Sequence, residues 1–316
     1  MPASASPRVS YVVTLYNKAA YLPQVWAGLV GQRGGFAAQY VFVDDGSTDD
    51  TVEVLQHLTA GTPDVVVLQQ ENAGPAVALN AGLAAATGEF VKLVDGDDVL
   101  LPWCTEWMLS ALQQTGAHAA CALPADQPGY VVGAPIAPAE PPWPTPERVD
   151  LLPLSLKRAQ TMPSLWLARR EALRAVGGCD AGVFIQDYSL ELRLGALGKV
   201  ALLRAPVAAL AEQAPGRLSD NQAQTLHDMN RAALRFIAAR PALAPGLRRL
   251  AVQRALGRAY LWAIRRGGWW LAPRLLALRA LHALRLLPAG WAGQRVLCAP
   301  FATRHPVRVP RGHGPG

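Results

Sequence analysis

The sequence has few cysteines and few charges. Its 316 residues include four widely scattered cysteines, Cys104, Cys121, Cys179 and Cys298, and no Cys-x-x-Cys pair. This pattern indicates neither a disulfide framework nor a cysteine zinc site. Only 17% of the residues are charged and 51% are hydrophobic, which is typical of a folded protein with a large core rather than of a disordered chain.

Long apolar runs are also missing. Residues Met1 to Arg8 contain no hydrophobic stretch of the signal-peptide kind. Arg, Pro or Gly interrupts every later apolar run well short of a membrane span. We therefore expect a cytoplasmic protein.

Acidic residues are nearly absent from the last third of the chain. Residues 221–316 contain 16 Arg, no Lys and one acid, Asp228, for a charge of +15, whereas residues 1–220 contain 14 basic and 22 acidic residues, for −8. An acidic body with a basic tail implies two surfaces with different partners. We predict one domain at 1–220 and an Arg-rich helical extension at 221–316.

Short apolar runs alternate with helical patterns in the first hundred residues. This alternation is typical of right-handed βαβ units and of a mostly parallel sheet with helices on both faces. The eight prolines of residues 124–146 predict a surface loop. The pattern predicts strands at 9–15, 40–43, 65–68, 90–94, 165–167 and 200–203, and helices at 20–30, 47–58, 75–86, 103–114, 170–176 and 188–197.

Two acidic segments each close an apolar run. Asp95, Asp97 and Asp98 follow the predicted strand 90–94, and Asp44-Asp45 follows the strand 40–43. Carboxylates this close repel one another unless a cation or a partner sits there. The carboxyl ends of strands are also where open α/β sheets bind ligands. The segments therefore favour a site for a hard cation such as Mg²⁺ or Mn²⁺ with a phosphorylated ligand; the alternative is a solvated acidic turn.

Six short motifs follow one another along the first hundred residues. They are Thr14-Leu15-Tyr16-Asn17-Lys18, Val43-Asp44-Asp45-Gly46-Ser47-Thr48-Asp49, Asn72-Ala73-Gly74, Asn80-Ala81-Gly82, Gly88-Glu89-Phe90 and Asp95-Gly96-Asp97-Asp98. In this order they resemble the motifs of the family 2 glycosyltransferases. The resemblance spans residues 9–203 and implies a GT-A fold. It also implies a hexosyltransferase-type enzyme (EC 2.4) that moves a sugar from a nucleotide-diphosphate donor with inversion.

The resemblance also implies roles for individual residues. Asp97 and Asp98 would hold Mg²⁺ or Mn²⁺, and the ring of Tyr16 would stack on the nucleobase. Asp44 could instead interact only with a helix N-terminus, and Asn80 could be an ordinary exposed helical residue. The implied donor-binding residues are Thr14, Tyr16, Asn17, Asp44, Asp45, Asn72, Gly74, Asn80, Asp95 and Asp97.

The general base implied by the resemblance is Asp187. It would remove the proton of the acceptor hydroxyl as that oxygen attacks the sugar. Gln186 stands where the family has Glu, which removes a negative charge and predicts a weaker base. The alternative is that Asp187 only caps a helix.

Arg and apolar residues alternate at helical spacing in the C-terminal extension, for example in Tyr260–Arg266 and Leu275–Leu281. Two interpretations stay open: a peripheral helix on an anionic membrane surface, at the inner face of the cytoplasmic membrane, or a cap packed on the catalytic domain. Nucleic acid is not expected as a partner, because the body is acidic and carries no known reader motif.

Together these features predict a metal-dependent inverting glycosyltransferase. Its acceptor would be a glycan or a lipid-linked molecule, in polysaccharide or cell-envelope biosynthesis. The alternatives are a non-catalytic module that binds a nucleotide sugar or a glycan, and a membrane-associated scaffold.

Overall fold

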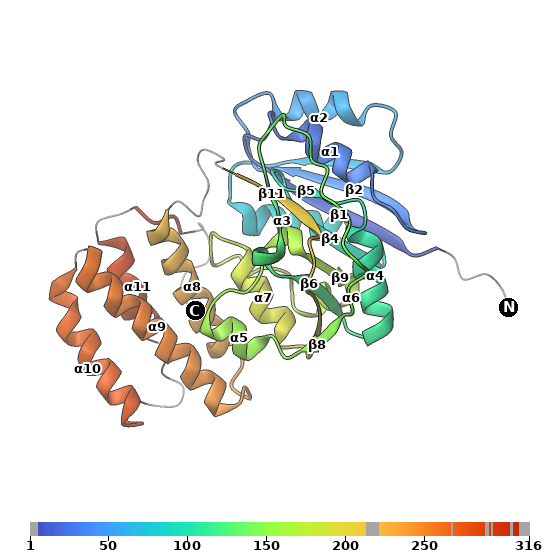
Figure 1. The fold of residues 1–316 in the computed structure, drawn as a ribbon. Helices are drawn as coiled ribbons and strands as arrows, with labels where there is room; N and C mark the ends of the chain where they lie inside the picture. The colour runs from blue at the N-terminus through green and yellow to red at the C-terminus, as the bar shows by residue number, and fades with distance from the viewer. Residues whose placement is uncertain are drawn as a thin grey trace.

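The computed structural model describes residues 6–212, 221–266, 268–287, 291, 293–303 and 306–309. The predicted domain boundary at residue 220 falls just outside these ranges. An α/β body forms one part of the molecule, and the C-terminal helices, coloured orange to red, lie against one side of it (Figure 1).

The large sheet has the strand order β3-β2-β1-β4-β9-β6-β10-β8, and a small sheet has the order β5-β11-β7. β1 runs parallel to β2 and β4, β2 to β3, and β6 to β10, whereas β9 is antiparallel to β4 and β6. The strands are β1 (Arg8–Leu15), β2 (Ala37–Asp44), β3 (Val65–Gln69), β4 (Phe90–Asp95), β5 (Val99–Leu100), β6 (Ala119–Ala122), β7 (Gly129–Tyr130), β8 (Glu147–Val149), β9 (Trp166–Arg169), β10 (Val200–Leu203) and β11 (Ala208–Ala211).

Helices cover both faces of the large sheet, so the predicted α/β class is confirmed (Figure 1). The helices of the body are α1 (Leu22–Val30), α2 (Thr51–Thr59), α3 (Pro75–Ala85), α4 (Cys104–Thr115), α5 (Leu152–Lys157), α6 (Arg170–Ala175) and α7 (Asp187–Gly195). The helices of the extension are α8 (Gln222–Ala238), α9 (Pro245–Arg266), α10 (Ala272–Ala283) and α11 (Gln294–Cys298).

The alternation of side chains along β1 produces two cores. Val9, Tyr11, Val13 and Leu15 pack with apolar residues of α1 and α4 on one face. Val12, between them in sequence, packs with residues of α3 on the other face. Because successive side chains of a strand point to opposite faces, a strand covered on both faces is mostly apolar, as β1 is; its buried Ser10 is hydrogen-bonded to Gln39.

The parallel register brings the acidic strand ends together. Leu15 pairs with Asp44 of β2, and Thr14 pairs with Asp95 of β4. The two acidic segments of the sequence therefore lie at the same edge of the sheet, on either side of the end of β1. This is the edge at which the fold class binds ligands.

Some short elements differ from the predictions. β6 was not predicted, because its sequence Ala-Ala-Cys-Ala has no β-branched or aromatic residue. The passage 124–146, predicted as a loop, contains the short strand β7, which pairs with β11. A helix N-cap was predicted at Ser47-Thr48-Asp49, and α2 begins two residues later than Asp49, at Thr51.

The extension shares a core with the body. Leu152 and Leu156 of α5 and Tyr188 and Leu192 of α7 form one cluster with residues of α8, α9 and α11, including the buried Trp262. The extension is therefore packed against the α/β body. In the part of the chain that the structure describes, no helix is both long enough and apolar enough to cross a membrane.

Candidate active site

A cavity of about 640 Å³ opens at the edge of the sheet where β1 and β4 end, and residues of α7 and α8 form its other wall. It gathers most of the residues predicted from the sequence. The predicted residues that line it are Thr14, Tyr16, Asp45, Asn72, Asp95, Asp97, Asp98 and Asp187.

The acidic segment Asp95–Asp98, which begins with the last residue of β4, forms the floor of the cavity. The Asp97 carboxylate receives a hydrogen bond of 2.6 Å from Nζ of Lys18, and the hydroxyl of Tyr130 donates to the Asp97 carbonyl at 2.7 Å. Burial, followed by the charges of the neighbouring carboxylates Asp98, Asp97 and Asp187, raises the pKa of Asp95 well above its usual range. The carboxyl groups thus disfavour one another's charged forms, and a cation bound there would stabilise those forms.

Lys92 lies directly behind this acidic floor and was not predicted as a site residue. It is fully buried within β4, and its ammonium group donates to the carbonyls of Leu93, Ser164 and Trp166. Burial lowers the pKa of Lys92, while Asp98 and Asp95 act in the opposite direction. A charged residue inside an apolar strand was the available signal, because buried lysines require partners.

Asp45 shapes the loop between β3 and α3. Its carboxylate accepts hydrogen bonds from the side chain of Gln70 at 2.7 Å and from the backbone N–H groups of Ala73 and Gly74 at 2.9 Å each. Asn72 donates to the Asp45 carbonyl at 2.9 Å. Asp45 therefore holds the N-terminal end of α3 in place while it faces the cavity.

The other predicted donor residues are engaged away from the cavity lining. Asn17 accepts from the N–H of Thr48 at 2.8 Å. The Asp44 carboxylate accepts from the N–H of Ser47 at 3.2 Å. The side chain of Asn80 exchanges two hydrogen bonds with the backbone of Cys179, at 2.8 and 3.1 Å. In the structure these three side chains hold loops around the site, and their donor contacts stay predictions.

Gly74 directly precedes α3 and has a positive φ angle. Its φ of +93° is strained for a residue with a side chain, and a Cβ there would lie 2.6 Å from the ring of Phe184. The close approach lets Phe184, from the loop before α7, pack against the loop of Asp45. The predicted donor contact of Gly74 is not tested by this geometry.

Asp187 is the first residue of α7, and it lines the cavity opposite the acidic floor. Its carboxylate accepts from the N–H of Tyr188 at 2.8 Å. Burial, with a contribution from the charge of Asp228, raises its pKa. The neighbouring Gln186 donates to the Asp95 carboxylate at 3.2 Å, which links the start of α7 to the end of β4.

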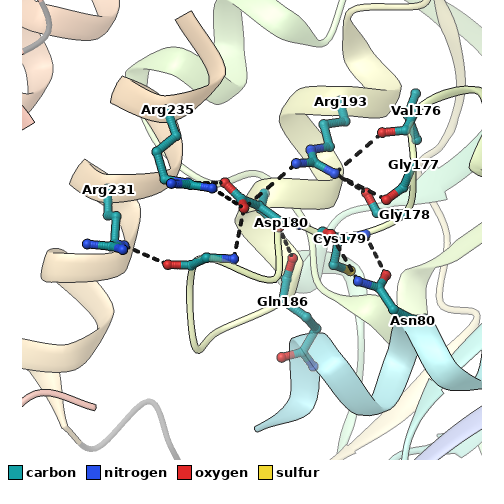
Figure 2. Close-up of polar contacts among 12 residues, drawn as sticks. Asn80, Val176, Gly177, Gly178, Cys179, Asp180, Gln186, Arg193, Arg231 and Arg235 are labelled. Atoms are coloured by element: carbon teal, nitrogen blue, oxygen red, sulfur yellow. Dashed lines mark hydrogen bonds and ion pairs between the residues drawn. The ribbon is translucent and has the colours of Figure 1, made fainter. Parts of the chain in front are cut away.

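Ion pairs centred on Asp180 anchor the loop that leads to Gln186 (Figure 2). Arg235 of α8 contacts both oxygens of Asp180, at 2.8 and 3.2 Å, and Arg193 of α7 lies 3.8 Å from it. Burial alone would raise the pKa of Asp180, but the hydrogen bonds from Arg235 and Gly182 outweigh it and hold this pKa below its usual value.

Arg193 and Arg231 secure the same loop through its carbonyl groups. Arg193 donates to the carbonyls of Val176, Gly177 and Gly178, and Arg231 donates to that of Gly182 at 2.6 Å (Figure 2). Two helices therefore hold one loop, α7 from the body and α8 from the extension.

The single acid of the basic extension, Asp228, is buried beside the candidate base. One oxygen accepts from the N–H groups of Phe184 and Ile185 at 3.0 Å each and from Gln224 at 2.9 Å. The other lies 2.8 Å from Nδ1 of His227. Its isolation among arginines in the sequence is the only signal that could have identified Asp228 as a structural partner of the site.

A mostly parallel sheet with acidic residues at the ends of β2 and β4, and a carboxylate from the start of α7 in the same cavity, is the arrangement expected of a GT-A-type glycosyltransferase. The chain belongs to glycosyl transferase family 2, whose model matches residues 10–177, more than half of the sequence. The resemblance to this family, predicted from the motifs, is confirmed.

The curated relatives match this chain over only about a third of its length. The uncharacterized glycosyltransferase YibD of Escherichia coli (strain K12) is 33% identical over 107 residues, which cover 34% of this chain and 31% of YibD. The chondroitin synthase of Pasteurella multocida is 33% identical over 103 residues, 33% of this chain and 11% of that protein. The chain thus spans about a third or less of the length of these relatives.

Two solved structures share the fold over nearly the whole chain. S. aureus TarS 1-349 in complex with UDP-GlcNAc has a TM-score of 0.65 and 16% identity, and the match covers 93% of this chain and 89% of that one. The mannosyltransferase PcManGT from Pyrobaculum calidifontis, in complex with GDP-Man and Mn²⁺, has a TM-score of 0.53 and 21% identity, with 95% and 87% covered. At these identities the likeness shows the fold alone.

Proposed function

We propose that this glycosyltransferase moves a sugar, with inversion, from a nucleotide-diphosphate sugar to a hydroxyl of a glycan or lipid-linked acceptor. The observation that carries the proposal is a single cavity lined by both the Asp95–Asp98 segment and Asp187. Two solved structures of the same fold contain nucleotide sugars, UDP-GlcNAc and GDP-Man. The acidic segment would face the donor, and Asp187 would face the acceptor.

In this reaction the acceptor oxygen forms a bond to the anomeric carbon while the bond from that carbon to the diphosphate breaks. The electron pair of the broken bond leaves with the nucleoside diphosphate. The proton of the acceptor hydroxyl passes to the Asp187 carboxylate. Because burial and Asp228 raise the pKa of Asp187, its affinity for that proton is higher than that of an ordinary aspartate, even with Gln186 in place of a charged neighbour.

The residues at the floor of the cavity suit Mg²⁺ or Mn²⁺. Asp97 and Asp98 offer the hard oxygen ligands that these ions prefer, and their mutual repulsion favours a cation there. When bound, the ion would stabilise the negative charge of the diphosphate. Among the residues that the structure describes, no group of three or more His, Cys, Asp or Glu could hold a metal, so further ligands would come from the diphosphate and water.

The proposal is tested by thermal unfolding with a panel of UDP-, GDP- and CDP-sugars, with and without Mn²⁺. A donor that binds the native state raises the unfolding temperature. We expect stabilisation by one of the donors, dependent on Mn²⁺, and its loss in Asp97→Ala. Stabilisation that is the same with EDTA would contradict metal dependence, and no stabilisation by any member would contradict the donor class.

We also propose that the outer face of the extension contacts an anionic membrane surface. A cavity of about 370 Å³ between α9 and α10 is lined by Arg249, Arg279, Arg285 and His282. Burial and Arg249 lower the pKa of His282, as expected where positive charge is concentrated. Elsewhere on α9, on α10 and in the segments next to them, large apolar side chains are exposed: Leu261, Ile264, Trp269, Trp270, Leu276, Leu281, Leu284 and Leu286.

Such a mixture of arginine and exposed Trp and Leu matches the interface of an anionic bilayer. Full-length protein should co-sediment with vesicles that contain phosphatidylglycerol and not with pure phosphatidylcholine. Replacing Trp269 and Trp270, which are 69% and 52% exposed, by Ser should reduce binding, and Val131→Ser on the body should not. Equal sedimentation with both vesicle types would contradict the proposal.

A further inference from the structure

Residues 306–309, called the C-terminal segment below, contribute to the candidate active site. Residues Pro306 and Arg308 line the same cavity as Asp95 and Asp187, although more than one hundred residues separate them in sequence. The matched family model ends at residue 177, so this part of the cavity wall lies outside it.

The backbone of Arg308 is fixed to α8. Its N–H donates to the side chain of Gln224 at 2.6 Å, and its carbonyl accepts from the same side chain at 3.0 Å. Gln224 is itself buried and bound to Asp228. This paired contact holds residue 308 at one place on the rim of the cavity.

The guanidinium of Arg308 stacks over Phe184, 5.4 Å from the ring centroid. The same ring packs against Gly74 at the start of α3. The stacking therefore places the charge of Arg308 on the side of the cavity that carries the Asp45 loop, which is the donor side in the proposed function. A guanidinium supported by an aromatic face is well suited to bind phosphate oxygens.

The residues that line the cavity offer an anionic ligand few positively charged groups. Among its described lining residues the cations are Lys18 and Arg308, against the carboxylates Asp45, Asp95, Asp97, Asp98, Asp187 and Asp228. Lys18 is already paired with Asp97. The N–H groups of Ala73 and Gly74, at the start of α3, are already bound to Asp45. Within the described part of the chain, Arg308 forms no ion pair and is exposed.

From these contacts we propose that Arg308 binds the diphosphate of the nucleotide-sugar donor, so that the C-terminal segment completes the donor site. The assignment rests on the proposed function. A diphosphate entering a cavity of carboxylates requires compensating positive charge, and Arg308 supplies it in addition to any bound metal ion. Because Gln224 holds its backbone and Phe184 already supports its guanidinium, the side chain loses less freedom on binding than an unsupported arginine would.

The test compares nucleoside diphosphate binding to the full chain and to Arg308→Gln by calorimetry, in buffer with Mn²⁺. Wild type is first titrated with UDP, GDP and CDP, and the tightest ligand is used. We expect Arg308→Gln to raise its Kd by roughly tenfold or more, the range for loss of a charge-assisted hydrogen bond. The salt dependence of binding should weaken, and Arg308→Lys should recover part of the affinity.

The matched control is Arg148→Gln, at an exposed arginine of β8 that does not line the cavity; it should bind as wild type does. Affinity for the corresponding nucleoside, which has no phosphate, should be equal in wild type and Arg308→Gln. Equal diphosphate affinity in wild type and Arg308→Gln would overturn the role of Arg308 alone. No binding of any diphosphate by wild type would overturn the proposed function together with it.

Discussion

Replacement of Asp228 tests whether the extension holds the loop before α7 in place. In Asp228→Ala, the N–H groups of Phe184 and Ile185, each 3.0 Å from the same carboxylate oxygen, lose their acceptor. An unsatisfied buried donor costs about 1–3 kcal/mol, so the two together predict a loss of about 2–6 kcal/mol in the free energy of unfolding. Against a typical total of about 5–15 kcal/mol, this loss is large enough to measure by urea unfolding followed by tryptophan fluorescence.

Asp228→Asn is the matched comparison. Its amide oxygen can accept from both N–H groups, while its NH₂ faces Nδ1 of His227. We therefore expect a loss of roughly 1 kcal/mol, the difference between charged and neutral hydrogen bonds. Similar losses in the two variants, or a loss below about 1 kcal/mol in Asp228→Ala, would refute the reasoning from hydrogen bonds.

The same substitution has an electrostatic consequence. The charge of Asp228 contributes to the raised pKa of Asp187. Its removal in Asp228→Asn should lower that pKa, and the acid limb of the profile of kcat against pH should move to lower pH. An unmoved acid limb would mean that Asp187 is not the group that titrates.

Three further predictions concern single positions. Asp187→Asn should abolish sugar transfer without unfolding the protein; full turnover with donor and acceptor present would remove Asp187 as the base. Burial raises the pKa of Glu191 from 4.5 to about 7. The contribution of protonated Glu191 to stability is therefore complete below pH 4.5 and is lost as the pH rises through 7. Relative to Glu191→Gln, wild type should lose about 3 kcal/mol of unfolding free energy over this pH range. Gly74→Ala should destabilise by more than Gly61→Ala, because both glycines have positive φ but only the first would place a Cβ against Phe184; equal shifts in unfolding temperature would contradict that contact.

The sequence by itself determined most strands of the large sheet, the order of its first elements and the acidic floor of the site. Burial along β1 and β4 is continuous and local, so the short runs of apolar residues predict these strands directly. Asp95 ends β4 and Asp97 follows it, and a parallel sheet must bring such strand ends to one edge. The family motifs added Asp187, which the structure places in the same cavity.

Only the tertiary structure decided which residues of the extension reach the site. Asp228 and Arg308 reach the site because α8 packs on α7 and the C-terminal segment binds Gln224. Contacts of this kind depend on the packing free energy of whole helices, so they cannot be predicted from the local periodicity of the sequence. Packing also decided that Asn80 bonds to Cys179, and that the Arg-rich extension, with one face buried against the body, presents its other face to solvent.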